Sequence, residues 1–207
     1  MRVKTDWFND NPLSAEAMLF GILAAALFSM PLGTAPPTAL SIAAAAVWLF
    51  SGTAFRAREI YLGEPWCRPV YALILLPWVF LIHSPDPGGI GLDYAGKTHY
   101  WVYALTLAAV AARPDRERLV QAFLAGLAAN ALVGLMQLAG LYPPTNGWYS
   151  GFGRGYSTLS AYLVLGMLMA SYYFRTVSDL RFKRLSLVLG GLYFFHLIIL
   201  QDRKSAV

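Results

Sequence analysis

Charged residues are scarce in this chain. Of its 207 residues only 13% are Asp, Glu, Lys or Arg, whereas 57% are hydrophobic. A soluble domain usually carries about 25% charged residues. The missing charge indicates that lipid surrounds most of the chain, so we expect an integral membrane protein. The formal net charge of +5 does not indicate a nucleic-acid partner, because the basic residues lie in short clusters between apolar runs, which is the topology signal of membrane proteins.

The chain also lacks the patterns of metal centres and of soluble enzymes. Cys67 is the only cysteine, which excludes an intrachain disulfide and argues against redox chemistry. No His-Glu-x-x-His pattern occurs, no Cys/His cluster has the spacing of a zinc site, and no phosphate-binding glycine loop precedes Lys-Ser/Thr. We therefore expect no bound metal and no cofactor.

What the chain has instead is a series of apolar runs. A helix that crosses a membrane needs about 20 mostly apolar residues at about 1.5 Å each. The fold class that we expect is all-α: a polytopic transmembrane helix bundle with about seven spans, in a single domain over residues 1–207. The final Ser205-Ala206-Val207 opens a further apolar run, which indicates the N-terminal half of a longer protein. The seven predicted spans cover residues 15–33, 36–55, 66–83, 94–112, 119–141, 157–174 and 185–200.

The basic residues are divided unequally between the two sides of such a bundle. Cytoplasmic segments of membrane proteins carry an excess of Lys and Arg, and this excess predicts a cytoplasmic N-terminus. Twelve basic residues then lie inside and four outside. The inner set is Arg2, Lys4, Arg56, Arg58, Arg68, Arg113, Arg116, Arg118, Arg175, Arg181, Lys183 and Arg184, and the outer set is Lys97, Arg154, Arg203 and Lys204.

The four outer cations are the candidate site residues, because topology selects against positive charge on that side. A guanidinium offers five donors in a fixed fork, which suits phosphate or diphosphate. Together the four could bind a lipid-linked phosphate; the alternative is that they only anchor span ends to lipid headgroups. His196 lies inside the seventh run, where we expect it to bond a neighbouring helix.

Two segments carry a resemblance to a known family. One is the glycine- and aromatic-rich 151–163, Gly-Phe-Gly-Arg-Gly-Tyr-Ser-Thr-Leu-Ser-Ala-Tyr-Leu, which leads directly into an apolar run. The other is 200–207, Leu-Gln-Asp-Arg-Lys-Ser-Ala-Val, where an arginine follows an apolar run. With the basic inner loop between them, they resemble the O-antigen ligase and O-antigen polymerase superfamily. The chain departs from that family where Asp202 and Lys204 flank Arg203, and where Arg154 stands in the glycine loop at the place of a His or Asn.

The resemblance implies a function. It implies an inner-membrane glycan transferase that moves an oligosaccharide or polysaccharide from an undecaprenyl-diphosphate carrier to an acceptor on the periplasmic side, either lipid A core or a growing glycan. Arg203 would be the catalytic residue on the periplasmic side, and Arg154, Lys97 and Lys204 would bind the lipid diphosphate. The partners would be the lipid-linked glycan, the acceptor and membrane lipids. Two alternatives stay open: a multi-span transporter or flippase, and a membrane assembly subunit without catalysis.

Overall fold

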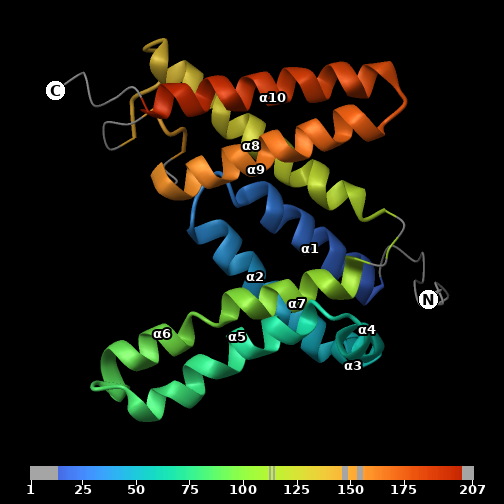
Figure 1. The fold of residues 1–207 in the computed structure, drawn as a ribbon, viewed down its shortest axis with the longest axis vertical. Helices are drawn as coiled ribbons and strands as arrows, with labels where there is room; N and C mark the ends of the chain where they lie inside the picture. Colours follow the sequence, from blue (N-terminus) through green and yellow to red (C-terminus); the bar gives the residue numbers. More distant parts are fainter. Residues whose placement is uncertain (1–13, 112, 114, 146–148, 153–155, 202–207) are drawn as a thin grey trace. The chain divides into compact units, whose positions relative to one another are not determined.

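The computed structural model describes residues 14–111, 113, 115–145, 149–152 and 156–201. Within these ranges every regular element is helical and no β-strand occurs, which confirms the all-α prediction (Figure 1). The elements are α1 (Ala15–Ser29), α2 (Ala35–Phe50), α3 (Thr53–Arg56), α4 (Arg58–Gly63), α5 (Cys67–Phe80), η2 (Leu81–His83), η3 (Pro87–Gly91), α6 (Leu92–Gly96), α7 (His99–Ala111), α8 (Glu117–Leu138), α9 (Tyr156–Thr176) and α10 (Leu180–Gln201).

Three of these helices are long and apolar enough to cross a membrane. They are α8, the segment Ser157–Thr176 of α9, and the segment Leu180–Ile199 of α10. Each of the seven predicted spans contains a helix, but the other four helices are shorter: α1 has 15 residues, α2 has 16, α5 has 14 and α7 has 13. A 15-residue helix rises about 22 Å, less than the hydrocarbon core of about 30 Å. The described residues therefore indicate a membrane protein with three helices of spanning length, fewer than the seven expected.

The chain forms two compact units. Of the described residues, the first unit comprises those in 14–24 and 38–117, and the second comprises those in 25–37 and 118–201. The single domain over residues 1–207 stays a prediction.

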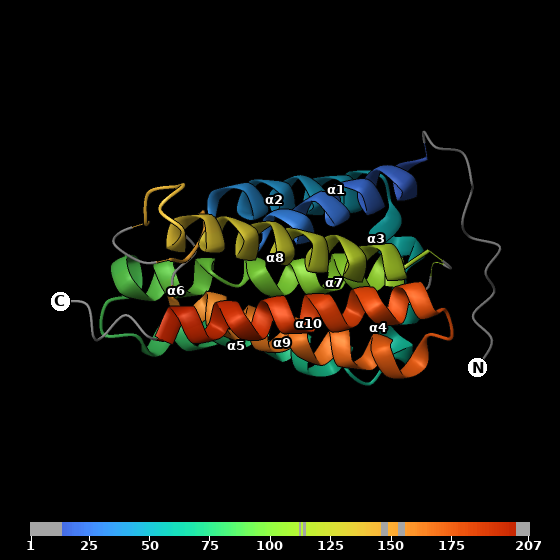
Figure 2. The ribbon, with the colours of Figure 1, turned by 90° about the horizontal axis from the view of Figure 1, so that it is seen from above.

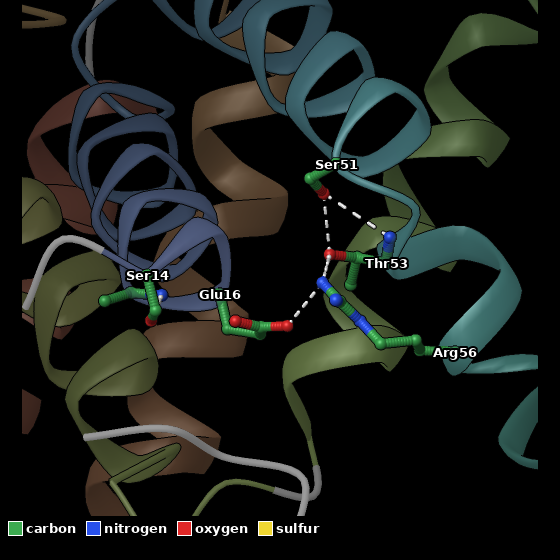
Figure 3. A network of polar contacts seen from close by, with 6 residues as sticks. Ser14, Glu16, Ser51, Thr53 and Arg56 are labelled. Atoms are coloured by element: carbon green, nitrogen blue, oxygen red, sulfur yellow. Dashed lines mark hydrogen bonds and ion pairs between the residues drawn. The ribbon is translucent and has the colours of Figure 1, made fainter. Parts of the chain in front are cut away.

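In the first unit, a polar cluster ties the start of α1 to the turn after α2 (Figure 3). Gly52 ends that turn with a φ of 73°, in the left-handed region that glycine adopts without strain. The Ser51 and Thr53 hydroxyls lie 2.7 Å apart, and Arg56 Nη2 donates to Thr53 Oγ1 at 3.1 Å. Arg56 also pairs with Glu16, whose side chain is only 14% exposed, so the cluster joins two segments 40 residues apart in the chain.

A buried aromatic pair joins α2, α4 and α7 within the same unit. Trp48 Nε1 donates to Tyr61 Oη at 2.7 Å, and the Tyr61 hydroxyl donates to the Leu105 carbonyl at 3.3 Å. The two rings meet edge to face, with centroids 6.0 Å apart. Burial disfavours a phenolate and raises the pKa of Tyr61 to about 12. The hydroxyl therefore stays protonated at neutral pH and can serve as both acceptor and donor.

The predicted fourth span, 94–112, differs most from the structure. The Pro- and Gly-rich stretch before it folds into η3, whose N-terminus is capped by the Asp86 carboxylate, which accepts the Gly89 and Ile90 N–H groups at 3.0 and 3.1 Å. This is the side-chain capping that stabilises helix N-termini. Helix α6 follows directly. A turn at Lys97 and Thr98 then separates α6 from α7. The run 94–112 is therefore divided, and its apolar helix begins only at His99.

The second unit has a core between α8, α9 and α10. Leu127, Leu159, Leu163 and Tyr193 are fully buried there, and the Tyr193 hydroxyl donates to the Leu124 carbonyl at 2.7 Å. Helices α9 and α10 lie side by side in both views (Figures 1 and 2). This packing leaves the C-terminal end of α10 beside the chain segment that joins α8 to α9.

Candidate functional site

Gln137, in the last turn of α8, binds the segment that connects α8 to α9. Its Nε2 atom lies 3.0 Å from the Pro143 carbonyl, 3.1 Å from Thr145 Oγ1 and 2.9 Å from the Gly151 carbonyl. Its Oε1 atom accepts the Gly151 N–H at 2.8 Å. The side chain is 2% exposed. A buried amide with this many partners holds both ends of the connection against one helix.

Asn130, two turns earlier on α8, binds the same connection. Its Nδ2 atom donates to the Ser150 carbonyl at 3.0 Å, and its Oδ1 atom accepts the Phe152 N–H at 3.0 Å. Between these residues Gly151 has a φ of 76°, and a Cβ there would overlap the Asn130 amide. The backbone therefore reaches the helix surface only because residue 151 is glycine.

His196 holds the connection from α10. Its Nε2 atom lies 2.8 Å from the Tyr149 carbonyl, and because a carbonyl only accepts, Nε2 carries the proton. The side chain is fully buried, and its Nδ1 atom has no partner among the described residues. The prediction that His196 bonds a neighbouring helix is wrong, since its partner belongs to the connection between helices.

Together Asn130, Gln137 and His196 form a polar platform under the connection, and of these residues the sequence analysis singled out only His196. Asn130, Gly134 and Gln137 are spaced i, i+4, i+7, so they share one face of α8. Two amides at this spacing inside an apolar run are the signal that could have found them. The platform fixes the backbone of residues 149–152 against α8 and α10.

The four predicted site residues fall into two groups. Lys97 is described: it is exposed, its Nζ lies 2.7 Å from Asp93 Oδ2, and it lies 4.6 Å from the centre of the Tyr94 ring. Its charge is therefore already paired with a carboxylate. Arg154, Arg203 and Lys204 lie outside the described residues. The last described residue before Arg154 is Phe152, and the last before Arg203 and Lys204 is Gln201.

The fold and the site together define the class of this protein, a helical membrane protein with a buried polar platform under one interhelical connection. No group of three or more His, Cys, Asp or Glu side chains in the described part of the chain could hold a metal ion. No protein-family model, no curated protein and no solved structure matches the chain.

Gly134 provides a direct test of the platform. A Cβ at this position would overlap the His196 ring and come within 2.9 Å of the Tyr149 carbonyl. We expect Gly134→Ala to lower the free energy of unfolding by about 1–3 kcal/mol, the usual cost of overpacking, as measured by thermal unfolding in detergent. Gly191→Ala on α10 is the control, because its Cβ meets nothing within 4 Å and alanine favours helix by up to about 1 kcal/mol. Equal effects of the two variants would contradict the close packing around His196.

Proposed function

We propose that this protein is an inner-membrane glycan transferase that uses an undecaprenyl-diphosphate-linked donor. The observation that carries the proposal is the hydrogen bond between His196 and Tyr149. Tyr149 lies five residues before Arg154, and His196 lies seven residues before Arg203. The hydrogen bond therefore joins the residues that precede the two family-like segments, 151–163 and 200–207. This proximity supports a shared site for Arg154 and Arg203.

The chemistry of the donor explains why such a site would use arginine. In the transfer the bond between the sugar C1 and the diphosphate oxygen breaks and undecaprenyl diphosphate leaves. A glycosidic bond to an acceptor hydroxyl forms, and the proton of that hydroxyl is released to a base. Negative charge builds on the leaving diphosphate, and preorganised cations stabilise it. Arg203 takes the catalytic role, and Arg154 and Lys204 bind the diphosphate. Lys97 is already paired with Asp93, which favours the arginines as principal ligands.

The proposal includes a topology. All seven apolar runs would cross the bacterial inner membrane, with the N-terminus in the cytoplasm and Arg203 on the periplasmic side. The twelve-to-four division of basic residues supports this orientation. The four shorter helices would then cross with their flanking residues at the interfaces, where exposed aromatics such as Trp66 and Trp101 favour the headgroup level.

Loss of the gene tests the function. We expect its deletion in the native host to remove the mature surface glycan and to accumulate undecaprenyl-diphosphate-linked glycan in the periplasmic leaflet. The measurement is mass spectrometry of lipids extracted from spheroplasts after a membrane-impermeant reagent has labelled the glycan that is accessible from outside. The purified protein in liposomes should then release undecaprenyl diphosphate when donor and acceptor are supplied. Accumulation in the cytoplasmic leaflet would instead favour a flippase. Normal transfer by deletion membranes would contradict a transferase.

A further inference from the structure

The hairpin between α9 and α10 carries an unbalanced cluster of positive charge. Four cations occur within ten residues, against one carboxylate, Asp179. Asp179 accepts the Arg181 N–H at 2.8 Å and so caps α10. None of the four cations forms an ion pair with another described residue, and three of the four are exposed. They are Arg175, Arg181, Lys183 and Arg184.

Two of these arginines lie at the N-terminal end of an exposed apolar stripe on α10. Residues Arg181, Arg184, Val188 and Phe195 fall on one face, because they are spaced by three, seven and fourteen positions. Val188 is 65% exposed and Phe195 is 50% exposed. Tyr193, which is buried in the core, lies on the opposite side of the helix, so the stripe faces away from that core.

The length of the stripe matches half of a membrane. From Arg184 to Phe195 the helix rises about 16 Å, close to one leaflet of a hydrocarbon core of about 30 Å. The stripe and the two arginines at its end together match the length of one phospholipid. The phosphate of such a lipid would lie at the arginines, and an acyl chain would lie along Val188 and Phe195. The exposed Leu180 and Phe182 beside the cations suit the level of the headgroups.

We infer that the N-terminal end of α10 is a binding site for an anionic diacyl phospholipid. The guanidiniums of Arg181 and Arg184 bind the phosphate, and Arg175 and Lys183 add attraction for a negatively charged headgroup. A zwitterionic phospholipid offers the same acyl chains but no net charge, so the site discriminates by charge. This site does not depend on the proposed glycan transfer.

Native mass spectrometry of the purified protein in detergent tests the site. With phosphatidylglycerol and phosphatidylcholine supplied at equal concentration, we expect retention of phosphatidylglycerol and about tenfold weaker retention in R181Q/R184Q. The control R58Q/R68Q removes two exposed arginines from the first unit and should retain phosphatidylglycerol as the wild type does. If R181Q/R184Q does not fold, R181K/R184K provides the test instead. It keeps both positive charges and should keep most of the phosphatidylglycerol binding.

Three results would overturn the site. The first is equal retention of phosphatidylcholine, and the second is an equal loss in R58Q/R68Q, which would indicate general charge attraction. The third is complete displacement of the lipid by millimolar inorganic phosphate, since the acyl chain would then contribute nothing. Little displacement by phosphate, with loss only in R181Q/R184Q, supports the phospholipid.

Discussion

Replacing Arg203 by alanine is expected to lower glycan transfer by about 100-fold or more while the protein remains inserted. One preorganised donor to a developing negative charge contributes about 10²–10³ in rate, and Arg203 is the donor proposed for the leaving diphosphate. The measurement is release of undecaprenyl diphosphate by liposomes that contain the protein, with protein amount determined alongside.

Two further variants separate a role in catalysis from anchoring at the membrane surface. Arg203→Lys keeps the charge but loses the two-donor geometry, so we expect partial activity. Arg68→Ala removes an exposed arginine at the start of α5 and should leave transfer unchanged. Full activity of Arg203→Ala would mean that Arg203 only anchors the chain to headgroups, and the resemblance would fail at its principal residue.

Replacing Gln137 by leucine is expected to lower the free energy of unfolding by about 2–4 kcal/mol and to reduce glycan transfer in parallel. Leucine has similar volume but leaves the buried Gly151 N–H without its acceptor and removes the amide's bonds to the Pro143 and Gly151 carbonyls. Each unsatisfied buried group costs about 1–3 kcal/mol, although the connection will relax in part. Thermal unfolding in detergent and the liposome assay provide the two measurements.

The matched control lies on the same helix. Gln121 of α8 is exposed, so Gln121→Leu removes the same amide without breaking the platform, and stability should change by less than about 0.5 kcal/mol. If Gln137→Leu unfolds like the wild type, the connection is held by other contacts. If it is destabilised but fully active in the folded fraction, the platform supports the fold and has no part in transfer.

Much of the fold could be predicted because hydrophobic runs are a local property. The scarcity of charge and the apolar runs predicted an all-α membrane protein, and each run does contain a helix. The limits of the runs were less predictable. The run 94–112 reads as continuous, but the chain turns at Lys97 and Thr98, where Trp78 Nε1 donates to Thr98 Oγ1 from α5. That contact joins residues 20 positions apart, and local hydrophobicity does not report it.

The candidate site shows the same division more sharply. The sequence by itself determined the apolar, membrane-protein character of this chain and its helical class, because both depend on composition summed over a segment. Only the tertiary structure decided that Asn130, Gln137 and His196 converge on residues 149–152. Their convergence depends on how α8 and α10 pack, and on Gly134 and Gly151 allowing backbone and side chains to approach within hydrogen-bonding distance. A buried polar group must find a partner, but which partner it finds is a property of the packed helices.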